Sequence, residues 1–200
     1  PELDAIADGN QGIALEMSAY PYSNLPDILD LAARGGEPPL VLILDTLQDP
    51  QNLGTLLRTA EVTGVHGVLL PFRRTATVTP AVVHASSGAS EHLLVAQVNL
   101  AQAIDLLKEA GVWVIGLESG AGALPPEQVH LAGFSPSWQR MALVVGGEAE
   151  GMRPLVRASC DLLLRLPMRG HVASLNAAVA GSIALYLAWQ ARRFPGRLDR

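Results

Sequence analysis

Three separate segments of the sequence carry polar side chains that could do chemistry. The candidates are Asp49, Asn52 and Arg58 in "QDPQNLGTLLR", Glu148 in "VVGGEAEGM", and Ser174 and Asn176 in "HVASLNAA". Carboxylates, amides and guanidinium groups orient polar substrates through hydrogen bonds, and a guanidinium also stabilises negative charge. No single segment identifies a reaction, so the fold that positions the three segments has to be considered with them.

Each segment also has a purely structural interpretation. Asn52 is a suitable helix N-cap, and Arg58 is placed to pair with Glu61 on the same helix face. The glycines on either side of Glu148 suit a tight turn. Ser174 is another candidate N-cap. These interpretations stay open while each segment is considered by itself.

The common nucleotide and metal motifs are absent from the sequence. The loop "DTLQDPQN" has no glycine that would let a phosphate approach the backbone, and "VVGGEAEGM" does not match G-x-G-x-x-G. There is no P-loop and no G-x-S-x-G elbow, and the five histidines lack the spacing of metal ligands. The lone cysteine, Cys160, excludes a disulfide framework. Hydrolase, nucleotide-triphosphatase and metal-site hypotheses are therefore weak, and a nicotinamide-dependent reductase is poorly supported.

The composition is that of one folded domain of ordinary size. The chain has 200 residues, of which 49% are hydrophobic and 16% charged, and its formal net charge is −5. This charge argues against a uniformly basic nucleic-acid binder but allows a local arginine patch. The acidic start "PELDAIADGN" is no secretory signal, and the longest apolar run, Ala177 to Trp189, is too short to span a membrane. We therefore expect a cytoplasmic protein without a membrane segment.

Apolar runs and helical periodicities alternate from Leu40 onward. Strand-like runs occur at "LVLIL", "GVLL", "LLVAQV", "VWVIGL", "MALVVG" and "DLLLRL". Between the first two runs, a buried helix face is predicted by the spacing of Leu53, Leu56, Leu57 and Ala60. This alternation predicts an α/β fold with a mostly parallel sheet and helices on both faces. The first polar segment would then follow the carboxyl end of the first core strand, where open α/β sheets bind ligands.

The first 38 residues differ from the rest of the chain. "GIALEM" predicts a short strand, and "NLPDILDLAARGG" predicts a short helix closed by glycines. We interpret residues 1–38 as a connector, which could be the end of a missing N-terminal RNA-binding domain. Residues 39–200 are expected to form a single domain.

Taken in order, the three polar segments resemble motifs of the SpoU-type, TrmH-like RNA ribose methyltransferases of the SPOUT superfamily. "LDTLQDPQNLGTLLRTAEVTG" is similar to the first motif of that family, "VVGGEAEGM" to the second and "LPMRGHVASLNAAVAGSIALY" to the third. Residues 86–117 resemble the branch that modifies a guanosine of large-subunit ribosomal RNA, and "NQGIAL" resembles the end of that branch's linker. Asn10, Ala173 and Ala178 depart from the residues usual in the family.

The resemblance implies a methyl transfer from S-adenosylmethionine to a ribose 2′-hydroxyl of RNA. It also implies a homodimer, and a deep trefoil knot in the carboxyl half of the sheet with the donor bent inside it. The implied donor contacts are mainly backbone groups around Gly146, Leu166, Leu175, Leu117, Gly116, Gly151 and Met168. A bulky valine at position 146 would then obstruct donor binding. We expect the helix from Asn176 to Trp189 to pack, with the N-terminal core helix, against its symmetry mate.

The resemblance also assigns roles to the polar candidates. Arg58 matches an arginine proposed to activate the hydroxyl. Because a guanidinium stays protonated, we expect Arg58 to grip a phosphate and stabilise developing alkoxide charge, with the proton passing to a phosphate oxygen or water. The residues that would position the ribose and hold the loops together are Asn52, Glu148, Ser174 and Asn176. The residues that would hold RNA are Arg73, Arg74, Arg153, Arg157 and Arg169.

Two alternatives to the ribosomal RNA enzyme stay open. The substrate could be a transfer RNA, or the protein could be a knotted RNA-binding protein that does not use the methyl donor. The intact polar residues of all three segments argue against a non-catalytic protein. A calorimetric titration with the donor would separate these hypotheses.

Overall fold

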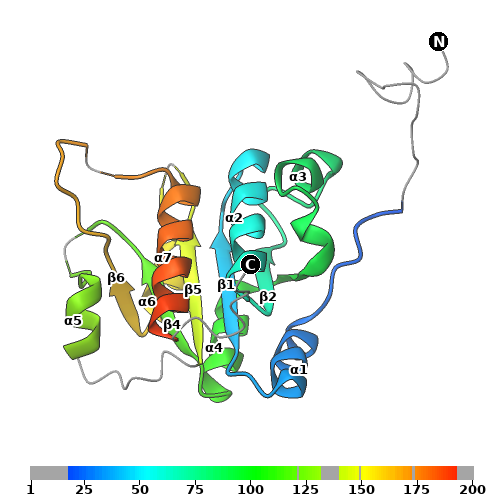
Figure 1. Ribbon diagram of the computed structural model, residues 1–200, viewed down its shortest axis with the longest axis horizontal. Helices are drawn as coiled ribbons and strands as arrows, with labels where there is room; N and C mark the ends of the chain where they lie inside the picture. The colour runs from blue at the N-terminus through cyan, green and yellow to red at the C-terminus, as the bar shows by residue number, and fades with distance from the viewer. Residues whose placement is uncertain (1–17, 121, 132–139, 149, 173, 193–200) are drawn as a thin grey trace, which may run out of the picture.

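The structure is a computed structural model that describes residues 18–120, 122–131, 140–148, 150–172 and 174–192 (Figure 1). The predicted strand "GIALEM" and the family departures at Asn10 and Ala173 lie outside these residues. No helix in the described ranges is long and apolar enough to cross a membrane.

The centre of the fold is a single sheet of six strands in the order β3-β2-β1-β5-β4-β6. The strands are β1 (Leu40–Asp45), β2 (Gly67–Pro71), β3 (Leu94–Val98), β4 (Trp113–Leu117), β5 (Met141–Gly146) and β6 (Leu162–Leu164). Every pair of neighbouring strands is parallel. The predicted α/β class and the six predicted strands are confirmed.

The central strand β1 shows why its sequence is almost entirely apolar. Leu40, Leu42 and Leu44 face one hydrophobic cluster, whereas Val41 and Ile43 face the other. All six residues of β1 are buried. A parallel strand that is covered by helices on both faces must present apolar side chains on both faces, so its sequence is continuous rather than alternating.

Helices cover both faces of the sheet. On the face turned to the viewer in Figure 1, α2 (Pro50–Val62) and α7 (Ala177–Ala191) lie side by side. A Cβ at Gly181 would lie 2.7 Å from Leu56 Cδ2 and 3.1 Å from Val145 Cγ2, so this glycine allows α7 to pack closely on α2 and β5. The other helices are α1 (Leu25–Gly35), α3 (Pro80–Ala85), the 3₁₀ helix η1 (Ala89–His92), α4 (Leu100–Glu109), α5 (Pro126–Leu131) and α6 (Pro154–Ser159). Of these, α1, α4 and α6 supply the hydrophobic cluster of the opposite face.

The N-caps of the two helices beside the candidate site are not the residues that the sequence suggested, Asn52 and Ser174. Asp49 is the N-cap of α2, and its side chain accepts the backbone N–H of Gln51. Asn176 is the N-cap of α7 and accepts from the next turn. Asn52 therefore lies inside the first turn of α2, and Ser174 lies before α7. Both residues are left with side chains that do not cap a helix in this way.

The described part of the predicted connector packs against the sheet. Ser23 pairs with Ala96 of β3, and the Tyr20 hydroxyl donates to the Ser90 carbonyl at 2.6 Å. Ile28 of α1 is fully buried, and its side chain occupies the space that a Cβ at Gly67 would need. Residues 18–38 thus contribute to the core, while the predicted domain boundary at residue 38 stays a prediction.

The strand order places a reversal between β1 and β5. β1, β2 and β3 follow one another outward in one half of the sheet, whereas β5, β4 and β6 form the other half. Asp45 and Gly146, the last residues of β1 and β5, are paired in register. The loops that leave these two strands diverge, and such a reversal is where open α/β sheets form a ligand crevice.

Candidate active site

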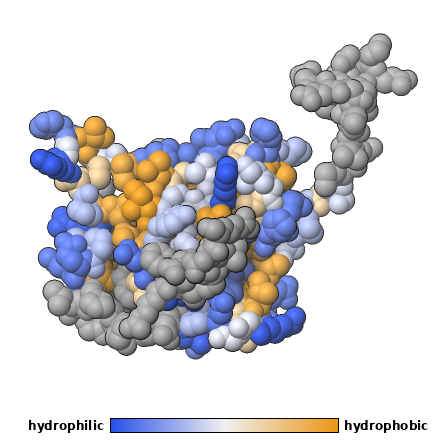
Figure 2. Space-filling model, viewed as in Figure 1, coloured by the Kyte–Doolittle hydropathy of each residue, from blue (hydrophilic) through white to orange (hydrophobic). Residues whose placement is uncertain are grey.

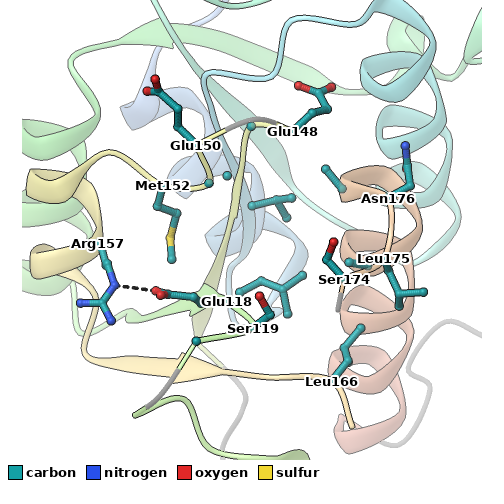
Figure 3. Close-up of a pocket in the computed structure, with 18 of the residues that line it drawn as sticks. Glu118, Ser119, Glu148, Glu150, Met152, Arg157, Leu166, Ser174, Leu175 and Asn176 are labelled. Carbon is teal, nitrogen blue, oxygen red and sulfur yellow. Dashed lines mark hydrogen bonds and ion pairs between the residues drawn. The ribbon is translucent and has the colours of Figure 1, made fainter. Parts of the chain in front are cut away.

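A pocket of about 690 Å³ opens at the carboxyl edge of the sheet (Figure 3). Its walls come from the segments after β4, β5 and β6 and from the start of α7. Glu148 and Glu150 stand at its rim in Figure 3, with Ser174, Leu175 and Asn176 on one side. A pocket of this size can enclose a small organic ligand.

The turn after β5 is closed by the backbone alone. The N–H groups of Gly147 and Gly151 each donate to the other residue's carbonyl at 3.1 Å. A Cβ at Gly146 would lie 2.3 Å from the carbonyl carbon of Gly151, which leaves no room for any side chain there. Gly151 has a φ of 68°, a left-handed conformation that favours glycine. At Gly146 the close approach that the structure shows is made by the chain itself, and the donor contact at this residue stays a prediction.

The three polar segments meet in one hydrogen-bonded chain. Asn176 Oδ1 accepts the N–H groups of Ala178 and Val179, so its Nδ2 is the atom left to donate. Asn176 Nδ2 donates to Asn52 Oδ1 at 3.1 Å, and Asn52 Nδ2 donates to Glu148 Oε1 at 2.8 Å. The helix cap thus fixes the orientation of both amides, and Glu148 accepts as a carboxylate.

Arg58 lies on α2 outside the wall of the pocket. Its Nη1 donates to Ser87 Oγ at 3.0 Å, and among the described residues no ion pair with Glu61 is formed. Ser87 follows α3 and has a φ of 54°, which is uncommon for a residue other than glycine. The purely structural pairing of Arg58 with Glu61 is therefore wrong in this structure.

Two ion pairs that the sequence did not suggest fix the loops around the pocket. Asp45 is fully buried at the end of β1 and accepts both the backbone N–H and the Nε of Arg153 at 2.7 Å. Glu118, directly after β4, accepts Nε of Arg157 at 2.6 Å inside the pocket (Figure 3). The only sequence signal for Asp45 and Glu118 was their position at the carboxyl ends of strands, which many structural residues share.

Most of the predicted donor-contact residues line the pocket. They are Leu117, Gly146, Gly151, Leu166, Met168 and Leu175. Gly116 does not line it; a Cβ there would lie 2.8 Å from Met152 Cε and 2.9 Å from Cys160 Sγ. Of the predicted catalytic residues, the pocket is lined by Glu148, Ser174 and Asn176, whereas Asn52 adjoins it through Glu148.

The candidate RNA-binding arginines are divided between two settings. Arg153 and Arg157 hold Asp45 and Glu118, respectively. Arg73, Arg74 and Arg169 are exposed, and in the described part of the chain no ion pair or hydrogen bond of their side chains is found. The exposed three are free to meet a polyanion.

Cys160, whose thiol lies close to Gly116, is poorly suited to nucleophilic chemistry. Burial, followed by the charge of Asp161, raises the pKa of its thiol to about 11. The thiol donates to the carbonyl of Val156 at 3.3 Å. A thiol with this pKa stays protonated near neutral pH, so Cys160 serves as a packing residue.

The sequence and the fold are similar to those of known proteins. The chain matches the SpoU rRNA Methylase family over residues 39–186. It is 42% identical over 193 residues to YacO of Bacillus subtilis strain 168, whose name places it among TrmH family tRNA/rRNA methyltransferases. That alignment covers 96% of this chain and 75% of YacO.

Two solved structures share the fold. One is an AdoMet-bound rRNA methyltransferase from Sinorhizobium meliloti, 28% identical with a TM-score of 0.72. The other is an RNA 2′-O ribose methyltransferase, 26% identical with a TM-score of 0.63. They are matched over 85% and 89% of this chain, and over 61% of their own length in both cases. The chain therefore spans about three fifths of each solved relative.

The family match includes all three polar segments and every strand of the sheet. It confirms the resemblance that the motifs indicated: the chain belongs to the SpoU rRNA methylase family of RNA methyltransferases.

Proposed function

We propose that this chain transfers a methyl group from S-adenosylmethionine to a ribose 2′-hydroxyl of RNA, with a guanosine of large-subunit ribosomal RNA as its substrate. The main observation behind this proposal is that hydrogen bonds join Glu148, Asn52 and Asn176. These bonds bring three segments that are distant in the sequence together at the mouth of one pocket. The solved relatives support the proposal, since one binds AdoMet and another is a 2′-O ribose methyltransferase.

The pocket suits the methyl donor. Leu117, Leu166 and Leu175 offer an apolar lining for a flat adenine, and the glycines at 146, 147 and 151 leave the backbone beside it free of side chains. Glu118 presents a carboxylate that can accept hydroxyl hydrogens of the donor's ribose, and Arg157 holds it in place. When bound, the donor supplies an electrophilic methyl group on a sulfonium.

The protein's own contribution is to orient the acceptor and to stabilise charge. The hydrogen bonds that join Glu148, Asn52 and Asn176 fix the loops on which a ribose would rest. Holding the acceptor in a fixed geometry can supply a large part of the rate enhancement. Arg58 is exposed and positively charged, so it can contact a phosphate and the developing alkoxide. The proton would leave to a phosphate oxygen or water, because a guanidinium does not accept it.

We also propose the predicted homodimer. Val179, Ile183 and Tyr186 recur at helical spacing on α7 and are 46%, 40% and 48% exposed. Figure 2 shows an apolar area over α7. An apolar stripe on a helix is a suitable isologous interface. Light scattering at micromolar concentration should give a dimer mass, and a monomer mass would contradict this part of the proposal.

The deep trefoil knot and the cytoplasmic location remain parts of the proposal. In support of the knot, residues 165–172 follow the edge strand β6, and α7 packs on α2 and β5. At the start of the segment 165–172 the Arg165 N–H donates to the carbonyl of Leu124, so this segment runs against the one that follows β4.

The function is tested by methyl transfer to defined RNA pools. The chain would be incubated with radiolabelled donor and either ribosomal or transfer RNA from cells that lack the gene, and 2′-O-methyl marks would be mapped. A mark on a guanosine of large-subunit RNA is expected. A mark only on transfer RNA would replace the proposed substrate, and absence of donor binding by calorimetry would favour the non-catalytic RNA-binding protein.

A further inference from the structure

The loop after β2 presents an aromatic ring beside two positive charges. Phe72 is 64% exposed, which places it among the most exposed large apolar side chains of the described chain. Arg73 and Arg74 follow it directly and are exposed. A single exposed phenylalanine is ordinary. Its combination with two guanidinium groups that have no side-chain partner in the described residues is a pattern that can bind a ligand.

The loop is fixed to the candidate active site. Thr75 Oγ1 donates to the carbonyl of Leu47 at 3.0 Å, and the backbone N–H of Ala76 donates to the same carbonyl at 2.7 Å. The next residue, Gln48, places its backbone N–H 3.5 Å from Glu148 Oε2. Residues 72–74 are therefore attached, through the loop after β1, to the hydrogen-bonded chain at the mouth of the pocket.

The loop also has a defined backbone. Pro71 ends β2, and Arg74 has a φ of 58°, a left-handed conformation that few residues other than glycine adopt. The two hydrogen bonds to Leu47 hold this turn from the other side. A ligand would thus meet a preformed surface, which lowers the entropic cost of binding.

We infer that Phe72, Arg73 and Arg74 form a stacking site for an unpaired base of the RNA substrate. The base would lie on the ring of Phe72, and the guanidinium groups would contact the adjoining phosphates. Proteins recognise single-stranded RNA in this way, since every base has a face that can stack. The inference rests on the proposed function for the identity of the ligand as RNA, and it adds a contact next to the modified nucleotide.

The test measures binding of a single-stranded 12-nucleotide RNA that contains 2-aminopurine, whose fluorescence falls on stacking. Phe72→Leu keeps the apolar character but removes the flat face, and it should weaken binding on the order of 5- to 150-fold. Phe72→Trp should retain binding and quenching. The matched control is Leu106→Ala on α4, because Leu106 is also exposed, at 52%, and should bind like the parent.

A second measurement separates the ring from the charges. Arg73→Ala and Arg74→Ala should each reduce the slope of log K against log salt by about 0.7, the value for one phosphate contact on a single strand. Phe72→Leu should leave that slope unchanged, because stacking releases no counterion.

The inference is overturned if Phe72→Leu binds the single strand like the parent, or if the parent prefers the same sequence as a duplex or binds no single strand at low salt. A change of oligomeric mass in Phe72→Leu would assign the ring to a protein interface instead. Donor calorimetry and methyl transfer are measured on the same samples. Equal single-strand binding by Phe72→Leu and the parent, with methyl transfer intact, defeats only this inference, whereas a parent that binds no methyl donor defeats the proposed function.

Discussion

The two halves of the carboxyl edge of the sheet carry different kinds of side chain. The half formed by β4, β5 and β6 encloses a pocket with leucines, glycine backbone and one internal ion pair. The half formed by β1, β2 and β3 instead carries Arg58, Arg73 and Arg74 on exposed positions. The hydrogen bonds that join Glu148, Asn52 and Asn176 lie between the two halves.

This difference matches two kinds of ligand. A small, partly apolar donor gains affinity from enclosure and from backbone groups that need no side-chain ordering. A polyanion gains affinity from exposed cations through the release of counterions, and it needs no cavity. An overall net charge of −5 is compatible with RNA binding if the exposed arginines of this edge contact phosphates: Arg58, Arg73 and Arg74 in one half and Arg169, after β6, in the other.

Gly146→Ala should have the largest effect, because it disrupts the pocket half from within. The new Cβ would meet the backbone of Gly151 at 2.3 Å, and backbone cannot rotate away as a side chain can. We expect unfolding to become easier by on the order of 1–3 kcal/mol. Donor affinity should fall at least tenfold, since the turn forms part of the wall.

Thermal unfolding and donor calorimetry measure these effects. Gly170→Ala is the matched control, because a Cβ at Gly170 has nothing within 4 Å. A folded Gly146→Ala protein with parental donor affinity would show that the turn does not form the donor site.

Asn52→Asp acts on the boundary between the two halves. The change removes the amide N–H that donates to Glu148. It places a second carboxylate where the amide nitrogen lay 2.8 Å from Glu148 Oε1. We expect methyl transfer to slow about 10- to 100-fold through misplacement of the acceptor. Donor affinity should change less than about threefold, since Asn52 is outside the pocket wall. Gln51→Glu adds the same charge on the neighbouring residue and should be nearly silent; equal losses in both variants would reduce the effect to bulk charge.

Asp45→Asn tests the support beneath both halves. Asp45 accepts two hydrogen bonds from Arg153, and an asparagine keeps only one acceptor atom. Leaving a buried group unsatisfied costs about 1–3 kcal/mol, so the urea midpoint should fall. Glu150→Gln, an exposed change in the loop that leads to Arg153, should stay within about 0.5 kcal/mol of the parent. Similar midpoints for the two variants would contradict the role of Asp45.

The smallest effect is expected at the opposite end of the sheet, at His66. Burial lowers the pKa of His66, with Glu37 opposing and Arg192 adding to the shift, and its Nδ1 accepts the N–H of Leu40 at 3.1 Å. Folding therefore favours the neutral ring. Its contribution to stability is present above the unfolded-state pKa, near 6.5, and is lost as pH falls through the lower folded-state pKa.

Urea unfolding at pH 7.5 and 5.5 measures this dependence. The parent should lose more stability on acidification than His66→Gln, while methyl-donor affinity at pH 7.5 stays equal. If both proteins respond alike, other groups dominate the acid response.

The sequence was sufficient to predict the six strands and the helix between the first two of them, but not the caps of the helices. The strand runs and the face with Leu53, Leu56 and Leu57 follow from periodicity, which depends on local residues only. The caps depend on which of several good capping residues the backbone reaches. For α2 the two candidate caps, Asp49 and Asn52, lie three residues apart. For α7 the candidates Ser174 and Asn176 lie two residues apart.

The contacts within the site were beyond sequence reasoning for a different reason. Asn52 meets Glu148 across 96 residues of chain, and only the sheet order brings them together. Asp45 and Glu118 carry no distinguishing local pattern, and their partners Arg153 and Arg157 had been assigned to RNA. The donor contact at Gly146 stays a prediction, and the group that the structure places against this residue is the backbone of Gly151.

The most direct test of the account is the single-turnover rate of Arg58→Ala with saturating donor. Arg58 lies on the charged half, outside the pocket, so fold and donor affinity should be retained. Loss of one preorganised hydrogen-bond donor to the developing alkoxide should lower the rate of methyl transfer by a factor on the order of 10²–10³. Arg58→Lys should recover that rate only in part. A parental rate for Arg58→Ala would contradict the account, because the charged half would then take no part in the reaction.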